Sequence, residues 1–346
     1  MISARISKLN IRGFRRFQEP KSFIFKGPDR RPPATLVVAG PNGHGKTSFF
    51  EAILYALGRE RLIHTELDLD HHQRWLQSAL TATVQVKLTL EVSSAPNTIL
   101  GTRTPCSVEI VRSPGNWAVS SSREDEEAQP LSDDAGVIDE LIRGLPVAWF
   151  SSWRQPYLCG PVRPMSEPPT VARGEADRLC RVKQRIIDER TRSAFTRIAG
   201  RDARWIEVLN RAWSTLRGDD GTSFTTTGAN IDQGQTHFDL WIQRKDPEFD
   251  DLAVCRIDQL SSGELEWLAL VGTLITEDFN GIVLIDEPEL HLHPEWQARI
   301  LPALRAVVPE SQLVLATHAD PPWDQVFSFE RVLLVPPGDP REKAIR

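Results

Sequence analysis

The sequence predicts an α/β fold, in which a core of buried strands carries an N-terminal antiparallel sheet and a helical, basic insertion. Three observations predict it. Residues 34–40, 281–287 and 312–318 are continuous apolar runs rich in Val, Ile and Leu, as buried parallel strands are. From residue 81 to residue 111 apolar and polar residues alternate, which is typical of antiparallel sheet. Residues 171–217 look helical and are rich in arginine.

The N-terminal part of the chain supplies strands and a first helix. Residues 6–14 and 23–25 are expected to be short strands because apolar positions alternate. The buried strand at 34–40 ends in glycine, as expected before a tight loop. A helix should follow over residues 48–58, where apolar residues recur at helical spacing and Gly58 marks the stop.

The rest of the chain continues the same pattern. Residues 147–153 are a strand candidate, and the proline-rich stretch 154–169 indicates a boundary, because proline interrupts both helix and sheet. A strand is expected over residues 236–243 and a helix over residues 263–275, ahead of the last two buried strands.

Composition bounds the class of protein. The chain has 346 residues, 40% hydrophobic and 25% charged, as in soluble globular proteins. No apolar run reaches the roughly 18 residues that span a bilayer. The N-terminus mixes charged and apolar residues too finely for a signal peptide. We expect a cytoplasmic protein without a membrane partner, whose cysteines are reduced thiols without metal or redox spacing. These are Cys106, Cys159, Cys180 and Cys255.

The most specific motif is GPNGHGKTS, which fits G-x-x-x-x-G-K-[ST] and lies between a predicted strand and a predicted helix. Its glycines let backbone N–H groups approach phosphate oxygens, and the helix N-terminus adds its dipole. Lys46 would contact the β- and γ-phosphates of ATP, and the Thr47 hydroxyl would reach Mg²⁺. The expected ATP-binding residues are Gly40, Pro41, Asn42, Gly43, His44, Gly45, Lys46, Thr47 and Ser48.

Two further strands end in polar residues. Ile282 to Ile285 carry Asp286 and Glu287 to a strand end, where open α/β sheets bind ligands. Asp286 suits a Mg²⁺ ligand, and Glu287 suits a base that polarises the attacking water. His318 ends the next buried strand and can donate a hydrogen bond to a γ-phosphate oxygen or to water. The two strand ends are expected to be neighbours in the sheet.

A transition-metal site is the competing interpretation of the histidines. His291 and His293 stand close to the carboxylates, and His71 and His72 are adjacent. Catalytic zinc needs three protein ligands in fixed geometry, and nothing in the sequence resembles H-E-x-x-H. The sequence therefore supports a transition-metal site less well than a nucleotide-binding site.

The phosphate loop, the stretch LSSGE, a strand ending in DE and a strand ending in TH together resemble the ATP-binding cassette ATPases. The N-terminal KLNIRGFRRF and DEPELHLHPEW look like their non-transporter group, which includes RecF, SMC-type heads and overcoming-lysogenization-defect ATPases. EPELHLHP is similar to relatives in bacterial phage defence such as the Septu ATPase. The resemblance covers roughly residues 1–60 and 255–320.

The resemblance implies an ABC ATPase head and assigns further roles. Asp286 would be the Walker B carboxylate and Glu287 the catalytic one, with His318 as the switch histidine. Leu292 and His293 fall at the D-loop, and Gln155 is the candidate for the Mg²⁺-linked glutamine. Arg15 and Arg16 could approach the nucleotide, although surface arginines are the simpler interpretation. The signature motif, which would act in trans on the ATP of a second subunit, comprises Ser261, Ser262, Gly263 and Glu264.

The same resemblance implies one discontinuous ATPase domain with three parts. Residues 1–160 would form lobe I, 161–275 the helical lobe with the signature motif, and 276–346 the part that completes the core. Only about a hundred residues lie between Gln155 and Leu260, without sustained heptads, so no long coiled coil is expected. The 28 residues after His318 are too few for a toprim nuclease domain, so a separate polypeptide would do any cutting.

The leading hypothesis is an ATPase that forms a homodimer or higher homo-oligomer around ATP. It would act on DNA, or control a separate nuclease or toxin, in anti-phage defence or DNA repair. A transporter subunit and a non-hydrolysing, ATP-gated scaffold are the alternatives. Residues 172–204 hold ten Arg or Lys against five acids and could contact DNA or RNA. The alternative to nucleic-acid contact is a solvated helix whose arginines pair with nearby acids.

Overall fold

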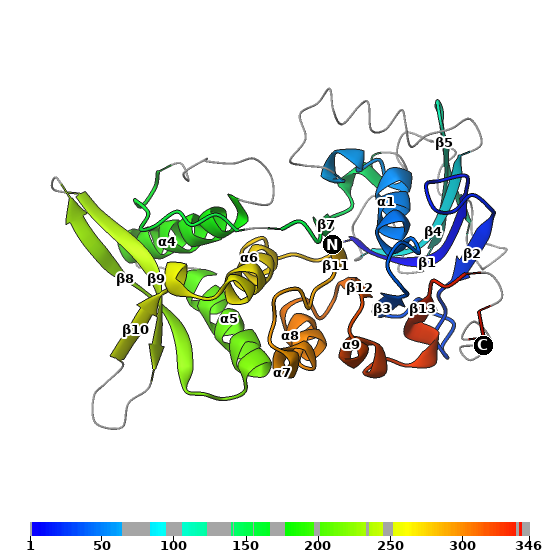
Figure 1. Ribbon diagram of the computed structural model, residues 1–346. Coiled ribbons are helices and arrows are strands. Elements are labelled where there is room, and N and C mark those ends of the chain that lie inside the picture. The colour runs from blue at the N-terminus through cyan, green and yellow to red at the C-terminus, as the bar shows by residue number, and fades with distance from the viewer. Residues whose placement is uncertain are drawn as a thin grey trace. The chain divides into compact units, whose positions relative to one another are not determined.

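A computed structural model gives the structure of residues 2–63, 84–94, 106–122, 140, 142–154, 156–166, 177–196, 201–232, 235–244, 252–336 and 339–340. The chain divides into two compact units (Figure 1). Unit 1 comprises Met1–Ser152, Asn280–Pro288 and Glu310–Arg346. Unit 2 comprises Trp153–Phe279 and Glu289–Pro309.

Unit 1 contains an antiparallel sheet in the strand order β2-β1-β4-β5-β6. Its strands alternate between a buried and a more exposed face, as the sequence predicted, in the described residues 84–92 and 107–111. The bounds are β1 (Ile2–Arg12), β2 (Lys21–Ile24), β4 (Gln85–Ser94), β5 (Cys106–Ser113) and β6 (Asn116–Ser122).

The second sheet of unit 1 is parallel, in the order β13-β3-β12-β11-β7. Its central strands are buried along their length, because apolar side chains cover both faces. The register pairs Asp286 of β11 with Ala316 of β12, so the prediction that these two strands are neighbours is confirmed. The bounds are β3 (Thr35–Ala39), β7 (Val147–Phe150), β11 (Ile282–Asp286), β12 (Gln312–Thr317) and β13 (Arg331–Leu333).

Helix α1 (Lys46–Ala56) joins the two sheets of unit 1 into one core. It contacts β4 and β5 of the antiparallel sheet and β11 of the parallel sheet. Phe49, Phe50 and Ile53 are completely buried there. The short helices η1 (Glu60–Leu62), α9 (Asp320–Asp324) and η4 (Ser328–Glu330) complete the described part of this unit.

A buried glutamine also connects the two sheets. The Gln312 side chain, at the start of β12, accepts a hydrogen bond from the Ile6 N–H of β1 at 2.7 Å. Its amide donates to the carbonyl oxygens of Ile6 at 3.2 Å and Pro33 at 3.0 Å. The donors and the acceptor of this fully buried amide are therefore satisfied.

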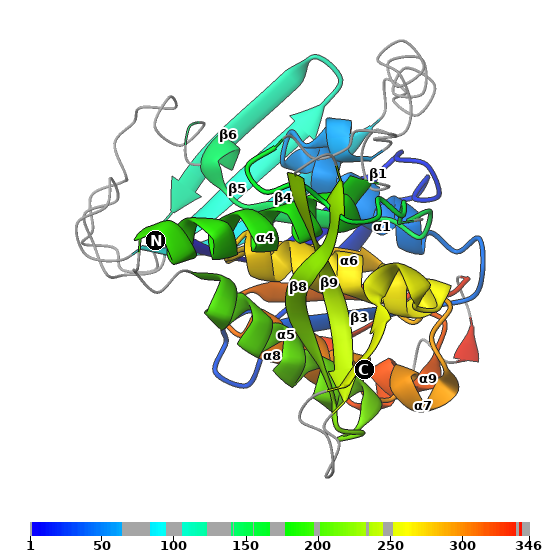
Figure 2. The same cartoon turned by 90° about the vertical axis from the view of Figure 1, so that its left-hand side faces the viewer.

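Unit 2 combines helices with a three-stranded antiparallel sheet in the order β10-β9-β8. Figures 1 and 2 show α4 and α5 beside α6. Helix α6 has polar residues in its sequence but buries almost every position. The bounds are α4 (Arg178–Thr196), α5 (Arg201–Arg217), β8 (Thr222–Asp232), β9 (Gln235–Arg244), β10 (Leu252–Arg256), η3 (Ile257–Gln259), α6 (Ser262–Thr276), α7 (Pro294–Gln297) and α8 (Ile300–Val307).

Sequence analysis anticipated only β9 of these three strands. The division into residues 1–160, 161–275 and 276–346 stays a prediction, beside a structure in which residues 289–309 group with unit 2. No helix in the described part of the chain is long and apolar enough to cross a membrane.

Candidate active site

The GPNGHGKTS loop of unit 1 runs from the end of β3 to the start of α1, as predicted. Gly45 is the N-cap of α1 with a φ of 97°, a left-handed conformation that favours glycine. A Cβ on Gly40 would lie 2.2 Å from the carbonyl oxygen of Leu334, so the close approach of these two backbones requires glycine. Because glycine has no side chain to cap the helix, the first-turn N–H groups of α1 are presented to the loop, where an anion can bind.

Lys46 is buried and its ammonium lies within this loop. The Nζ atom donates to the carbonyl oxygens of Gly40 at 2.8 Å and Pro41 at 3.3 Å. It is also 3.4 Å from Nδ1 of His318. The loop thus holds a buried cation against its own backbone, and its role in phosphate binding stays a prediction.

Thr47 and Asp286 meet across unit 1. The Thr47 hydroxyl donates to Oδ2 of Asp286 at 2.8 Å, and Asp286 is buried at the end of β11. A hydroxyl and a carboxylate are oxygen ligands of the kind Mg²⁺ prefers. These two residues, far apart in the sequence, therefore fit a Mg²⁺ ion that would accompany ATP.

Glu287 and His318 form a second pair, at the ends of neighbouring strands. Oε1 of Glu287 lies 3.3 Å from Nε2 of His318, and both side chains are partly exposed. Since the Lys46 ammonium can only donate, Nδ1 of His318 must accept and Nε2 carries the proton toward Glu287. Glu287 has a φ of 51°, and its N–H donates to the carbonyl of Ala316 at 2.8 Å. This left-handed φ is uncommon for a residue other than glycine.

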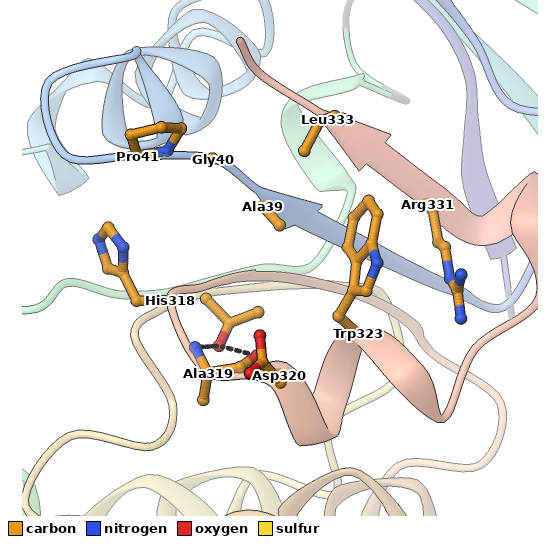
Figure 3. Close-up of a pocket in the computed structure, with 10 residues that line it drawn as sticks. Ala39, Gly40, Pro41, His318, Ala319, Asp320, Trp323, Arg331 and Leu333 are labelled. Carbon is orange, nitrogen blue, oxygen red and sulfur yellow. Dashed lines mark hydrogen bonds between the residues drawn. The ribbon is translucent and has the colours of Figure 1, made fainter. Parts of the chain in front are cut away.

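A cavity of about 560 Å³ lies beside the loop and His318 within unit 1. Figure 3 shows His318 at one side and Trp323 with Arg331 at the other. The Arg331 guanidinium lies 5.3 Å from the centre of the Trp323 ring. Trp323 and Arg331 were not predicted, because nothing in their local sequence indicates a site.

The two N-terminal arginines flank the phosphate loop. Arg16 is exposed, as a surface arginine would be, but its Nε donates to the Gly43 carbonyl at 2.5 Å. Arg15 forms an ion pair with Glu51, which is buried in α1. Arg16 therefore holds the phosphate loop through a hydrogen bond to its backbone. The sequence alone did not separate this role from that of an ordinary surface arginine.

The LSSGE stretch begins α6 in unit 2. Ser261 is the N-cap, and its hydroxyl accepts from the Glu264 N–H at 3.4 Å. The Glu264 carboxylate accepts hydrogen bonds from the Ser261 N–H at 2.9 Å and from the Ser261 hydroxyl at 2.8 Å, which completes a capping box. Glu264 also binds Arg217 at 2.5 Å. Ser261 and Ser262 are exposed, so the start of this helix is open to a ligand or partner.

The chain after Glu289 packs against the start of α6. A Cβ on Gly263 would lie 2.3 Å from the carbonyl oxygen of His291, so only glycine fits. The His291 imidazole binds the buried Glu266 carboxylate at 2.7 Å. Burial raises the pKa of Glu266 above its ordinary value, although His291 and Arg154 oppose this.

The proposed D-loop residues have local structural partners. Leu292 is buried, and its carbonyl accepts from the Gln297 amide at 3.1 Å. His293 is exposed, and its Nδ1 accepts from the Glu295 N–H at 3.4 Å as the N-cap of α7. Their role as a D-loop stays a prediction.

Two expectations fall outside the described residues: Gln155 as a Mg²⁺ ligand, and the His71–His72 pair. Among the residues that the structure describes, no three His, Cys, Asp or Glu side chains are grouped so that they could hold a metal ion.

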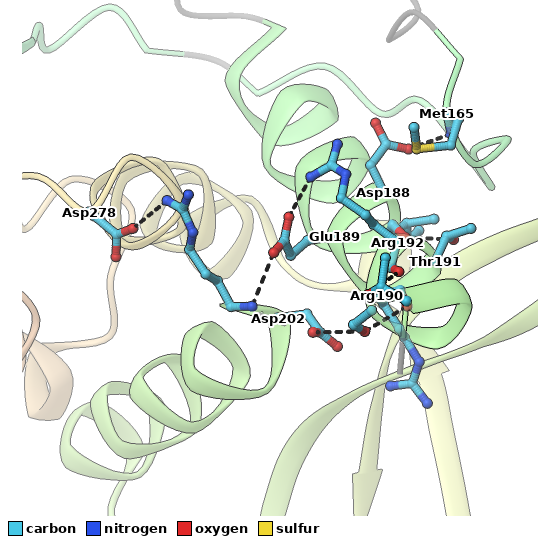
Figure 4. A network of polar contacts seen from close by, with 12 residues as sticks. Met165, Asp188, Glu189, Arg190, Thr191, Arg192, Asp202 and Asp278 are labelled. Carbon is cyan, nitrogen blue, oxygen red and sulfur yellow. Dashed lines mark hydrogen bonds and ion pairs between the residues drawn. The ribbon is translucent and has the colours of Figure 1, made fainter. Parts of the chain in front are cut away.

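The basic segment is described over residues 177–196 and 201–204. Lys183 is fully buried in an ion pair with Asp239. Several exposed arginines pair with acids, partly shown in Figure 4. These pairs are Arg185–Glu277, Arg192–Glu189, Arg201–Asp278 and Arg204–Asp278. The arginines remain at least 49% exposed, so pairing does not remove them from the surface.

The fold is that of an SMC-type P-loop ATPase head. The Smc head bound to the C-winged helix domain of ScpA matches with a TM-score of 0.52 and 14% identity, over 91% of this chain and 90% of that one. Residues 8–116 match a family described as "AAA domain". Residues 216–320 match one described as "AAA domain, putative AbiEii toxin, Type IV TA system".

The individual relatives are a Septu protein and two retron ATPases, all bacterial. Septu protein PtuA of Bacillus thuringiensis is 40% identical over 48 residues, 14% of this chain and 12% of PtuA. The "Retron Ec83 probable ATPase" of Escherichia coli is 42% identical over 73 residues, 18% of this chain and 14% of that protein. The "Retron Vc95 probable ATPase" of Vibrio cholerae is 34% identical over 113 residues, 28% and 21% respectively. The matches thus span about a fifth or less of each relative.

Proposed function

We propose that this protein binds and hydrolyses ATP, that two copies close around the nucleotide, and that closure acts on DNA or on a separate nuclease or toxin. The relatives support anti-phage defence as the setting, and DNA repair is the alternative. One observation carries the catalytic part: unit 1 brings Lys46, a Thr47–Asp286 pair and a Glu287–His318 pair together at the ends of three adjacent strands.

The chemistry follows from these contacts. The first turn of α1 and Lys46 would bind the phosphates, with Mg²⁺ held through Thr47 and Asp286 to neutralise their charge. Glu287 would accept a hydrogen bond from the attacking water and orient it, while the Nε2–H of His318 steadies the carboxylate.

Glu287→Gln tests the hydrolysis step. The amide keeps the size of the side chain but cannot act as a base, so turnover should fall by about a hundredfold or more. ATP binding should persist, because Lys46 and the loop are unchanged. Glu310→Gln is the matched control, an exposed glutamate at the edge of the same unit. Turnover equal to wild type in Glu287→Gln would remove the assigned base, and a wild type without turnover would favour the ATP-gated scaffold.

The shared site between two copies rests on the exposed start of α6, with Ser261 and Ser262. Sedimentation of the Glu287→Gln variant, which should trap ATP, would show a dimer in ATP and a smaller species in ADP. A transporter subunit would instead co-purify with a membrane permease.

Nucleic acid is the second target of the proposal, and four exposed arginines of α4 and α5 pair with acids there. Filter binding of double-stranded DNA at rising salt tests it. Affinity that falls steeply with salt, and is lost when Arg190 and Arg192 become Gln, would support contact. Binding that is absent or indifferent to salt would leave the partner effector as the target.

A further inference from the structure

Two cysteines that are well separated in the sequence meet in unit 2. The residues on both sides of Cys159, Tyr157 and Gly160, contact the turn of α4 that carries Cys180 and Lys183. Cys180 Sγ lies 3.5 Å from the Tyr157 carbonyl oxygen, so it faces the loop that carries Cys159. Sequence analysis expected scattered thiols without redox spacing, because the contact depends on how this loop packs on the first turn of α4.

The two thiols differ in access to solvent. Cys180 is fully buried within α4. Cys159 is only partly buried, and the two residues before it, Tyr157 and Leu158, are 41% and 46% exposed. A small oxidant can therefore reach Cys159 first.

Charged groups surround the pair. The Lys183 ammonium, one turn along α4 from Cys180, donates to the Gly160 carbonyl and to Asp239 at 2.8 Å each and to Asp258 at 2.9 Å. This arrangement places a cation at the backbone of the residue that follows Cys159.

The same neighbours make the thiols chemically unequal. The hydrogen bond with Cys180 lowers the pKa of Cys159 below that of an ordinary thiol, with Lys183 adding to the effect against burial and the two aspartates. That hydrogen bond and burial raise the pKa of Cys180 far above its usual value. A low-pKa, accessible thiol beside a second thiol is the arrangement that protein thiol oxidation requires.

We propose that Cys159 and Cys180 form an oxidisable dithiol that reacts with hydrogen peroxide or another small peroxide. The Cys159 thiolate attacks one peroxide oxygen and the O–O bond breaks, giving a sulfenic acid and hydroxide, which takes up a proton to become water. The Cys180 thiol then displaces the sulfenic oxygen as a second water, and the S–S bond forms. Two thiols are oxidised and one peroxide is reduced to two waters.

The test uses the whole chain without nucleotide, so it does not depend on the proposed ATPase activity. The protein is treated with hydrogen peroxide, denatured, alkylated and digested with trypsin. Arg173 and Arg178 lie between the two cysteines, so they end on different peptides. Mass spectrometry should find residues 155–173 linked to residues 179–181, lighter by two hydrogen atoms and released by a reducing agent. Cys255, whose pKa burial raises, should remain alkylatable.

Two variants check the order of events and guard against misfolding. Cys180→Ser should accumulate the sulfenic acid on Cys159, which dimedone traps, and Cys159→Ser should leave Cys180 unreactive to peroxide. Circular dichroism confirms that both are folded. A folded wild type in which Cys159 reacts no faster than Cys255, or in which no linked peptide forms, would overturn the proposal.

Discussion

Replacing Gly263 with alanine tests how tightly the start of α6 packs within unit 2. The added Cβ would lie 2.3 Å from the His291 carbonyl oxygen and 2.8 Å from its carbon. Ordinary contact begins near 3.4 Å, so the two backbones must separate by about 3.4 − 2.3 = 1.1 Å. Both atoms belong to the main chain, so no side chain can rotate away to relieve the overlap.

The sign of the effect makes this substitution informative. In an unobstructed helix, alanine is more stable than glycine by about 1 kcal/mol. Overpacking costs about 1–3 kcal/mol, and the loss should exceed the helical gain because only backbone can move. We therefore expect Gly263→Ala to lower the free energy of unfolding, and ATP turnover to fall because the signature start and the His291 segment shift together.

Urea denaturation followed by circular dichroism measures the stability, and a fluorescent ATP analogue measures binding to the phosphate loop of unit 1, which should be kept. Gly144→Ala is the control, since a Cβ there meets nothing within 4 Å and its φ is ordinary. It should be neutral or slightly stabilising. If Gly263→Ala were as stable and as active as wild type, the backbone approach to His291 would not constrain the protein.

Three further predictions follow from other contacts. Lys183→Met should destabilise the protein by about 3–5 kcal/mol, because it leaves the buried Asp239 without its cation, and urea unfolding measures the loss. Burial alone would lower the pKa of Lys183, but Cys159 and the hydrogen-bonded Asp239 raise it. The contribution of Lys183 to the free energy of unfolding is therefore complete below about pH 10.4 and is lost at higher pH. Alkaline unfolding of the wild type and of Lys183→Met would show this. Ser261→Arg should abolish ATP-driven association and turnover while nucleotide still binds, and normal turnover would refute a shared site. Thr47→Val should weaken the Mg²⁺ dependence of ATP binding, measured by titrating Mg²⁺, and an unchanged dependence would remove Thr47 from the ion.

The phosphate-loop half of the site could be predicted because each motif is local and ends a buried strand. The strand ends that carry Glu287 and His318 were expected to be neighbours and are, since parallel strands deliver their carboxyl ends to one edge. The second half depends on tertiary packing. Gly263 was visible only as part of a motif, and the His291 carbonyl that forbids a side chain there is a contact of the folded chain.

Strand prediction failed where the local sequence lacks an apolar pattern. β8 (TSFTTTGANID) is dominated by threonine and other polar residues, and its pairing with β9 shows only in the fold. The burial of Lys183 could likewise not be predicted from its local sequence. It was counted with the basic segment, yet its partners Asp239 and Asp258 lie far along the chain and bury it.

The Gln312 amide should couple the local opening of the two sheets of unit 1. The Gln312 side chain hydrogen-bonds to both backbone groups of Ile6, as a paired residue of a neighbouring strand would, and so links the two sheets. The Ile6 amide proton should then exchange with solvent only when β1 and β12 separate, at a rate set by the opening of both sheets rather than of either alone. Hydrogen exchange would therefore detect a single cooperative unit that runs from the N-terminal strand to the strand that ends beside His318.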